Sequence, residues 1–494
     1  MLDQDQINVF RSQPVAPQKL FIDGAWVDGT GDDLEVVSPI DGQVLTTLTR
    51  GTANDMARAI SSARAAFNDG RWSRMAPSGR KKVLHKLADL IEREALALTV
   101  LGVRDNGTEI GMAIKAEAGS AAGTFRYYAE AIDKIYGEIA PTPSDVLGLI
   151  HREPVGVVGA IVPWNFPLMI GAWKIAPALA AGNSVVLKPA ETASLSLLRI
   201  AELAAQAGLP DGVLNVVTGA GRVVGETLAL SMDVDVLAFT GSGPTGRRLL
   251  EYSARSNLKR CYLELGGKSP NIIFADAPDL DRAAKISAAG IFRNSGQVCV
   301  AGSRLLVEAS IHDDFVAAMA KHANALRVGD PLDLASDVGA INSLEQLTAD
   351  LRFVEVAESE GANRVTGGAR LLEETGGYYM APTIMSNVKP TDSLFKDEVF
   401  GPVLAVTSFE TEAEALQLAN GTDFGLASAV WTADLSRAHR MIRGINAGVV
   451  HVNTYGGADG TVPLGGVKQS GNGADKSLHA LDKYVDLKTA WIQL

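Results

Sequence analysis

The sequence predicts an α/β protein with more than one domain, and three observations support this prediction. The chain has 494 residues, whereas single hydrophobic cores rarely grow past about 250–300 residues. From residue 156 onward, short apolar runs alternate with segments of helical periodicity. A second alternation of the same kind begins after about residue 270. Each alternation predicts a parallel sheet covered by helices.

The first alternation contains five apolar runs that we expect to be strands: GVVGAIV, SVVLKP, GVLNVVTG, VDVLAFTGS and KRCYLELGG. Helix-like stretches lie between them, and SLSLLRIAELAAQAGLP ends in a helix stop at Gly208 and Pro210. This order implies right-handed crossovers and the doubly wound, nucleotide-binding type of sheet. The preceding residues 53–100 are expected to be helical, with Ser78 as an N-cap and an apolar face made of Val83, Leu87, Leu90 and Ile91.

The second alternation contains the runs NIIFADA, SRLLVEASI, GPVLAVTSF, FGLASAVWT and AGVVHVN. We expect them to form the sheet of a second α/β domain. Two further segments alternate like strands, namely VLGLIHREPV at 146–155 and the tail KYVDLKTAWIQL. These segments are expected to pair with each other or with another subunit.

Composition excludes several classes of protein. The net charge of −12 disfavours nucleic acid as a partner, and two cysteines cannot make a disulfide framework. The first residues, MLDQDQINVFRSQ, are polar and acidic and lack a basic, apolar signal segment. The longest apolar run, near GVVGAIVPW, is too short to span a bilayer. We therefore expect a cytoplasmic protein that binds neither nucleic acid nor membrane.

The glycine motif GSGPTG at 241–246 fits G-x-G-x-x-G between a predicted strand and a predicted helix. It is either a dinucleotide-binding loop or only a tight turn. In the first case Glu264, after the next strand, is one candidate for binding the ribose. The run VVLKPAE supplies a second candidate in Lys188 and Glu191, for which a solvated ion pair is the alternative. If Glu191 holds the ribose, Glu264 is free for chemistry.

The stretch FRNSGQVCV places Cys299 at the end of a glycine turn, after polar and small residues. Most free cysteines are buried and inert, and Cys261 in the apolar run KRCYLEL fits that pattern. Cys299 instead lies where a thiol can meet a substrate, so we expect it to be a nucleophile. A Cys–His hydrolase would need an activating imidazole, but none of the seven histidines has a local signature for that role. The nucleotide-binding pattern gives the better explanation.

Six motifs together resemble the aldehyde dehydrogenase superfamily in order and spacing: PWNFP (163–167), KPAE (188–191), FTGS (239–242), LELGGKSP, FRNSGQVCV and EVFGP (398–402). The resemblance covers nearly the whole chain and implies the α/β aldehyde dehydrogenase fold. Its parts would be a Rossmann-like parallel-sheet NAD-binding domain (1–134 and 156–266), an α/β catalytic domain (267–470) and a small β oligomerisation arm (135–155 and 480–494).

The resemblance implies oxidation of an aldehyde to a free carboxylic acid through a thioester on Cys299. The side-chain amide of Asn165 and the backbone N–H of Cys299 would stabilise the oxyanion. Glu264 would deprotonate the water that hydrolyses the thioester. The structural alternatives are a turn before Pro167 for Asn165 and an acid at a Gly-Gly turn for Glu264.

The implied cofactor is NAD, and several relatives accept NADP too. Lys188 and Glu191 would bind the adenosine ribose, and Ser242 would meet the pyrophosphate at a helix start. Glu398 would bind the nicotinamide ribose, with Phe400 near the ring. The remaining groove residues would be Ile161, Pro163, Trp164, Phe239, Gly241 and Leu265. No metal site is predicted.

The segments VWTADLSRAHRM and GGVKQSGNGADKSLHALDKY resemble bacterial enzymes that oxidise amino-, guanidino- or γ-glutamylamino-butyraldehydes in putrescine or arginine breakdown. Asp459 would attract a cationic substrate. The residues RDNGTEIGMAIKAEAG at 104–119 depart from the T-G-K-P that relatives commonly carry, and offer only Glu109 and Glu117 as acids. This departure counts against a cationic substrate. Family position places the tunnel at Phe166, Ile170, Trp173, Val298, Val300, Tyr455 and Leu464.

Three alternatives remain beside this hypothesis. One is a general short-chain or aromatic aldehyde dehydrogenase, and another is an acylating enzyme that passes the thioester to coenzyme A. The third is a retired nucleotide-binding protein without catalysis. Glu264 argues against the acylating enzyme, and the intact set of Cys299, Glu264 and Asn165 argues against the retired protein. Relatives form dimers or tetramers, so a homodimer or homotetramer is expected.

Overall fold

The computed structural model describes residues 2–457 and 459–494. Its first large sheet has seven strands in the order β11-β10-β7-β8-β9-β1-β2. The five predicted runs form its parallel part, while β1 and β2 add an antiparallel hairpin that the apolar pattern did not predict. The strands are β1 (Leu20–Ile22), β2 (Ala25–Val27), β7 (Val157–Ile161), β8 (Ser184–Lys188), β9 (Leu214–Val216), β10 (Val236–Thr240) and β11 (Arg260–Glu264).

Helices cover both faces of this sheet. Val158 and Ala160 pack into the core that contains α7 and α8, whereas Val157 and Ile161 pack into the core that contains α2 and α10. Burial on both faces explains why these strands are apolar throughout. The helices of this half are α2 (Ala53–Asn68), α3 (Pro77–Arg93), α4 (Ala95–Asn106), α5 (Ile110–Ala113), α6 (Ser120–Ala131), α7 (Pro167–Ala181), α8 (Leu195–Ala207), α9 (Glu226–Leu230) and α10 (Gly243–Ala254).

Two local predictions in this half have different outcomes. The helix stop is confirmed, because α8 ends at Gly208 with a φ of 99°. The N-cap at Ser78 was wrong, because α3 begins at Pro77 and the cap position is Ala76. Proline is favoured at the first helical position, where its missing N–H is not needed and its φ is already helical.

The second large sheet has the order β14-β17-β18-β13-β12-β20-β21. The five runs of the second alternation form β12, β13, β18, β20 and β21, all parallel to their neighbours. The pattern missed β17, which is parallel to β18, and β14, which is antiparallel to β17. The strands are β12 (Pro270–Ile273), β13 (Arg304–Glu308), β14 (Asn363–Thr366), β17 (Thr383–Ser386), β18 (Val403–Phe409), β20 (Ala427–Trp431) and β21 (Val449–Val452).

The helices of the second half are α11 (Leu280–Phe292), α12 (His312–Ala325), α13 (Leu344–Ser359), α14 (Ser393–Lys396), α15 (Glu412–Ala419) and α16 (Leu435–Gly444). Across the part of the chain that the structure describes, no helix is long and apolar enough to cross a membrane. The smaller elements are α1 (Gln4–Ser12) and three antiparallel pairs: β3 (Asp33–Val37) with β4 (Val44–Thr49), β15 (Arg370–Leu371) with β16 (Tyr379–Met380), and β19 (Phe424–Gly425) with β22 (Val467–Lys468).

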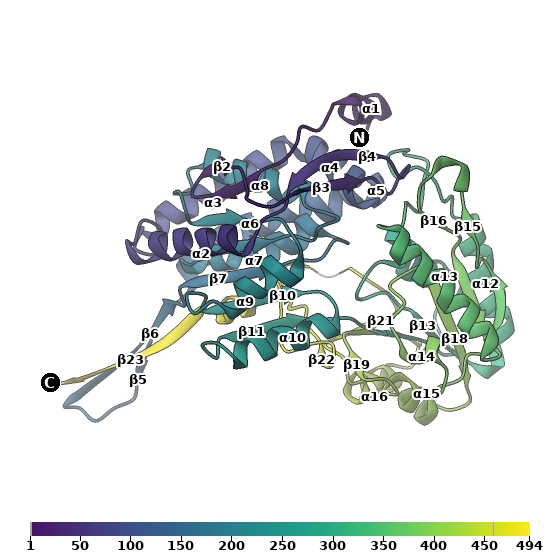
Figure 1. Ribbon diagram of the computed structural model, residues 1–494. Coiled ribbons are helices and arrows are strands. Elements are labelled where there is room, and N and C mark those ends of the chain that lie inside the picture. The colour runs from purple at the N-terminus through teal and green to yellow at the C-terminus, as the bar shows by residue number, and fades with distance from the viewer. Residues whose placement is uncertain (1, 458) are drawn as a thin grey trace.

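A three-stranded antiparallel sheet extends away from the rest of the molecule and carries the C-terminus at its tip (Figure 1). It consists of β5 (Glu138–Ala140), β6 (Val146–Pro154) and β23 (Val485–Gln493). The strands β6 and β23 pair along their whole length, so the two outlying segments do pair with each other. The domain boundaries given above stay predictions.

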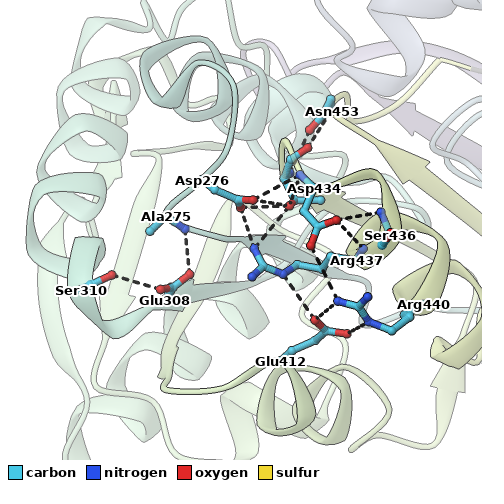
Figure 2. A network of polar contacts seen from close by, with 11 residues as sticks. Ala275, Asp276, Glu308, Ser310, Glu412, Asp434, Ser436, Arg437, Arg440 and Asn453 are labelled. Atoms are coloured by element: carbon cyan, nitrogen blue, oxygen red, sulfur yellow. Dashed lines mark hydrogen bonds and ion pairs between the residues drawn. The ribbon is translucent and has the colours of Figure 1, made fainter.

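A polar network fixes α16 to the loop after β12 and to α15 (Figure 2). Arg437 donates to Asp276 (2.7 Å) and to Glu412 (3.4 Å), and its guanidinium lies 4.4 Å from the centre of the Phe274 ring. Asp434 caps the start of α16 through the N–H of Ser436 (2.8 Å). Single exposed ion pairs contribute little to stability. The several contacts that Arg437 makes together therefore stabilise the position of α16 more than any one of them alone.

Candidate active site

Four parallel strands of the first sheet end along one edge. The chain leaves β7 toward Pro163, β8 ends at Lys188, β10 ends at Thr240 and β11 ends at Glu264. Ligands of open α/β sheets bind outside the carboxyl ends of the strands. Here this edge opens into a groove of about 630 Å³. Eight predicted cofactor-binding residues line the groove: Ile161, Pro163, Trp164, Lys188, Glu191, Phe239, Gly241 and Ser242.

A second cavity, of about 280 Å³, contains Cys299. This cysteine is half-buried, whereas Cys261 is buried. The predicted residues Asn165, Ile170, Leu265, Glu398 and Phe400 line the same cavity. It adjoins the groove, because both share the walls made by Pro163, Trp164, Thr240, Gly241, Ser242 and Gln346. The structure thus brings the cysteine, Asn165 and every predicted cofactor residue to two adjoining hollows.

The chain reaches Cys299 through a tight turn, Arg293–Gly296, between α11 and β13. Asn294 and Ser295 in this turn have left-handed φ values of 49° and 52°. Asn165, from the segment after β7, donates its Nδ2 to the carbonyl of Gln297 (2.9 Å). Both partners are buried, so this bond fixes Asn165 beside the cysteine segment.

The surroundings of Cys299 favour the neutral thiol. Burial, followed by the carboxylates of Glu398 and Glu264, raises the pKa of Cys299 to about 12. The backbone N–H groups of Val300 and of Cys299 itself act in the opposite direction. A cation or further donors must therefore enter this cavity before the Cys299 thiol ionises near neutral pH.

Glu264 is 7% exposed at the end of β11. Its Oε1 has no hydrogen-bond partner among the described residues. Burial, and then the Asp475 carboxylate, raises the pKa of Glu264 well above its ordinary value, while Lys174 and Lys483 act against this rise. An acid with these properties retains a proton further into the neutral range than an exposed glutamate.

The two lysines meet at Asp475. Lys174 Nζ lies 2.5 Å from one carboxylate oxygen and Lys483 Nζ lies 2.5 Å from the other. Burial alone would raise the pKa of Asp475, but the two ammonium groups hold it below its ordinary value. The cluster therefore places two cations against two acids, Asp475 and Glu264, in a water-poor region.

Glu398 is bound to the backbone of the Gly266–Gly267 turn. Its Oε1 accepts the N–H of Gly267 (2.9 Å), and a Cβ at Gly266 would lie 1.9 Å from Oε2. Only glycine lets the carboxylate approach this closely. Burial raises the pKa of Glu398 to about 7. The Phe400 ring, two residues later, meets the Trp164 ring edge-on at 5.2 Å between centroids.

A third cavity, of about 380 Å³, contains two predicted substrate residues, Trp173 and Asp459. Met169 lines this cavity while the next residue, Ile170, lines the Cys299 cavity, so α7 contributes to both. Lys476 Nζ lies 5.8 Å from the centre of the Trp173 ring. The cavity therefore presents an anion, a cation and an aromatic face.

The other predicted substrate residues lie elsewhere. Phe166 and Val298 pack in the hydrophobic core. Tyr455 donates its hydroxyl to the carbonyl of Val300 (2.8 Å), and Leu464 forms an isolated β-bridge. The walls of the three cavities contain none of the five remaining predicted residues, Phe166, Val298, Val300, Tyr455 and Leu464. Their contact with substrate stays a prediction.

Glu109 and Glu117, the acids considered for a cationic substrate, are each 5% exposed. Glu109 accepts the backbone N–H of Asn294 (3.0 Å), and Glu117 accepts that of Met169 (2.7 Å). Both carboxyl groups therefore face the backbone of elements that lead to the cavities.

Several residues of the site had little or no signal in the sequence. Gln346, in the first turn of α13, lines both the groove and the Cys299 cavity, and nothing in its local sequence distinguishes it. Lys174 had a usable signal, because it is the one charged residue in the otherwise apolar helix PLMIGAWKIAPALAA. A buried charge requires a partner, which here is Asp475.

The comparison with protein families decides the assignment. A model described as the aldehyde dehydrogenase family matches residues 26–490. The chain belongs to the aldehyde dehydrogenase family. The resemblance carried by the six motifs is thereby confirmed.

Individual relatives of this aldehyde dehydrogenase are similar over almost their full lengths. NADP/NAD-dependent aldehyde dehydrogenase PuuC of Escherichia coli is 51% identical over 477 residues, 96% of each chain. The solved structure of γ-glutamyl-γ-aminobutyraldehyde dehydrogenase from Burkholderia cenocepacia is 47% identical, with a TM-score of 0.98 and full coverage of both chains. A P. syringae indole-3-acetaldehyde dehydrogenase, AldA, solved with NAD+, is 48% identical, with the same TM-score and coverage.

The groove of this aldehyde dehydrogenase fits a dinucleotide. Lys188 at the end of β8 is 6% exposed, and Thr240 Oγ1 is buried without a hydrogen-bond partner among the described residues. Glu191 lies on the groove wall and accepts the N–H of Gly221 (3.2 Å). Lys188 and Glu191 together can meet the acceptors and donors of a ribose. Glu191, not Glu264, is the acid on this wall.

Alkylation of Cys299 by iodoacetamide tests the electrostatics of the cavity. In the protein without NAD, the rate should rise about tenfold per pH unit, without a plateau, from roughly pH 7 to pH 9, because burial raises the thiol pKa to about 12. Mass spectrometry of the peptide that contains Cys299 measures the rate, and the buried Cys261 serves as an internal control. A rate that already bends toward a plateau around pH 8.5 to 9, about the pKa of an ordinary thiol, would contradict this description.

Proposed function

We propose that this enzyme oxidises an aldehyde to a carboxylic acid with NAD through a thioester on Cys299. The observation that carries the proposal is that half-buried Cys299 shares one cavity with Asn165 and Glu398, beside the groove that fits NAD. The groups needed for attack, for oxyanion stabilisation and for cofactor binding thus meet at one place. NADP is the alternative cofactor.

In the first step the Cys299 thiol releases its proton to water, the resulting thiolate attacks the aldehyde carbon, and the carbonyl π electrons move to its oxygen. The Cys299 N–H and the Asn165 side-chain amide stabilise this oxyanion. One hydrogen of Asn165 Nδ2 is used by the Gln297 carbonyl, and the second is available to the oxyanion. The bond to Gln297 thus orients the donor before the substrate arrives.

When bound, NAD supplies the oxidant, an acceptor for the hydride of the aldehyde carbon. Lys188 and Glu191 hold the adenosine ribose, and Ser242 meets the pyrophosphate at the start of α10. Glu398 holds the nicotinamide ribose, and Phe400 restricts the space beside the ring. Loss of the hydride leaves the acyl group on the Cys299 sulfur as a thioester.

Glu264 then acts as the base for hydrolysis. It takes a proton from water, the oxygen of that water bonds to the acyl carbon, and the thiolate leaves. The raised pKa of Glu264 strengthens it as a base. The same rise means that the active carboxylate is lost as the pH falls through that pKa, so hydrolysis should slow on acidification.

The substitution Glu264→Gln separates the two half-reactions. It should keep a single burst of NADH per active site and lower steady-state turnover by about 10²–10⁴-fold, since only the base is removed. Stopped-flow absorbance of NADH measures both phases. Exposed Glu373→Gln is the control and should leave both phases unchanged. A Glu264→Gln enzyme that turns over at the parent rate would exclude Glu264 as the hydrolytic base.

For the substrate we propose an ω-amino-, guanidino- or γ-glutamylamino-butyraldehyde of polyamine or arginine breakdown. Two observations support this class: the relative from Burkholderia cenocepacia is named for such an aldehyde, and Asp459 lies with Trp173 on the third cavity. Lys476 on the same wall favours the γ-glutamylamino compound, whose end carries both an ammonium and a carboxylate.

The P. syringae relative acts on an aromatic aldehyde by name, and Tyr127, Tyr128 and Trp173 on this wall make an aromatic substrate the second candidate.

A panel of aldehydes tested on Asp459→Asn decides between these classes. The variant should raise KM about two- to fivefold for 4-aminobutyraldehyde at low ionic strength, as expected for an exposed charge pair. The KM for uncharged butyraldehyde should not change, which makes it the internal control. Equal effects on both, or preference of the parent enzyme for an aromatic aldehyde, would contradict the aminoaldehyde assignment.

We also propose that the three-stranded arm forms a homodimer or homotetramer contact in a cytoplasmic enzyme. Large apolar side chains are exposed on the arm and near it: Tyr136, Ile139, Leu487, Trp491, Ile492 and Leu494. Such a surface supports contact with a second copy of the chain.

A further inference from the structure

The region that departs from the family pattern contacts the turn before Cys299. Thr108 and Glu109 lie in the stretch 104–119, which departs from the T-G-K-P that relatives commonly carry. Thr108 donates its hydroxyl to Asn294 Oδ1 (2.8 Å). Glu109 Oε1 accepts the backbone N–H of the same residue (3.0 Å). Both departing side chains therefore hold Asn294.

The backbone conformation of the turn at Asn294 and Ser295 is energetically unfavourable unless other contacts hold it. Asn294 and Ser295 have φ/ψ values of 49°/36° and 52°/34°, and both carry side chains in the left-handed region. Side-chain bonds oppose relaxation: Ser295 Oγ donates to the carbonyl of Gly339 (2.9 Å), and Gln297 Nε2 donates to that of Asn294 (3.0 Å). The bond that Glu109 accepts fixes the peptide between Arg293 and Asn294, immediately before the two strained residues.

The position of this turn sets the surroundings of the sulfur. Asn294 Nδ2 donates to the backbone carbonyl of Asn165 (3.3 Å), so the turn also positions the predicted oxyanion donor. Five residues further on, the N–H groups of Cys299 and Val300 are the contacts that lower the pKa of the thiol. A shift of the turn would move these N–H groups away from the sulfur and favour the protonated, unreactive form.

Glu109 suits this role because it is interior and has few alternative partners. It is 5% exposed, and its Oε2 has no hydrogen-bond partner among the described residues. Burial raises the pKa of Glu109 to about 7, although backbone N–H groups, that of Asn294 first, act against this rise. The N–H groups of Glu109 itself and of Gly339 follow that of Asn294, and a buried, charge-assisted hydrogen bond such as the one to Asn294 restrains its amide strongly.

We infer that Glu109 is a positioning residue, whose carboxyl oxygen holds the Asn294 amide and thereby fixes the turn that presents Cys299 to the substrate. The inference rests on the proposed function, in which Cys299 is the nucleophile. Glu109 itself touches no reacting atom and acts through the backbone of residues 294–300.

Two substitutions at Glu109 distinguish the position of its acceptor oxygen from the negative charge of its side chain. Glu109→Asp keeps the charge but withdraws the oxygen by one methylene, and should slow Cys299 alkylation by iodoacetamide about fivefold or more, the scale of one lost buried hydrogen bond. Glu109→Gln keeps an acceptor oxygen at full reach and should stay within about twofold of the parent. The burst rate of NADH should follow the same order, while the KM for NAD stays at the parent value.

Asp105 offers a matched control. It is 2% exposed and accepts the N–H of Leu195 at the start of α8 (2.9 Å), not an N–H of the cysteine turn. Asp105→Glu makes the reverse one-methylene change in an equally buried acid and should leave the alkylation rate unchanged, even where it lowers thermal stability.

Parent-like alkylation in Glu109→Asp would overturn the inference. Equal slowing in Glu109→Gln, or in Asp105→Glu, would also overturn it, because the effect would then not depend on an acceptor at Asn294. If Glu109→Asp does not fold, Glu109→Met takes its place, because an apolar side chain of similar size removes the acceptor without leaving a buried charge. It should slow alkylation about fivefold or more, and parent-like alkylation in Glu109→Met would overturn the inference. Failure of the proposed function looks different, because the parent enzyme itself would then show no NADH burst.

Discussion

The hydrogen bond from Asn165 to the carbonyl of Gln297 (2.9 Å) joins the two halves of the site. Asn165 follows β7 of the first sheet, and Gln297 follows the turn that leads from α11 toward the second sheet. Both residues are buried, at 3% and 1% exposure. A buried donor or acceptor that loses its partner costs about 1–3 kcal/mol, so the two segments are held in one relative position. This fixed position brings Asn165, the proposed oxyanion donor, to Cys299, the proposed nucleophile.

The burial that fixes the geometry also disfavours the charged forms of Cys299, Glu398 and Glu264 when no ligand is bound. It raises the pKa of Cys299 to about 12 and that of Glu398 to about 7, and it raises the pKa of Glu264 as well. Groups shifted in this way are typical of catalytic sites. The lysine pair at Asp475 limits the shift at Glu264. The site is therefore prepared for a cationic ligand, and burial without that ligand leaves the thiol protonated.

The sequence predicts the strands that lie in long apolar runs better than the strands that do not. Runs such as GVVGAIV and SVVLKP are apolar throughout because β7 and β8 are covered on both faces. The strands β1, β2, β14 and β17 were missed because each has only three or four residues and lies in no such run. The N-cap of α3 was misplaced by two residues, at Ser78 instead of Ala76, because serine and proline signals compete at adjacent positions.

For the site, the motifs located the residues that follow strand ends, and these residues do gather around the groove and the Cys299 cavity. Contacts between distant segments had no local signal. Glu109 and Asn294 are 185 positions apart, and Lys174 and Asp475 are 301 apart. Side-chain pairing across such separations is set by the packing of whole elements. The departure at 104–119 counted against a cationic substrate and left Glu109 only as one of two acids, whereas in the structure its carboxyl group accepts the backbone N–H of Asn294.

The central claim is that the Cys299 sulfur becomes covalently bonded to the substrate carbonyl carbon. Acid quenching of the enzyme within one turnover, with NAD and aldehyde present, followed by mass spectrometry of its peptides, tests this claim most directly. We expect the peptide that contains Cys299 to carry the added mass of the acyl group. When NAD is omitted, this added mass should not be found. An acyl group on another residue, or product formation without any acylated peptide, would contradict it.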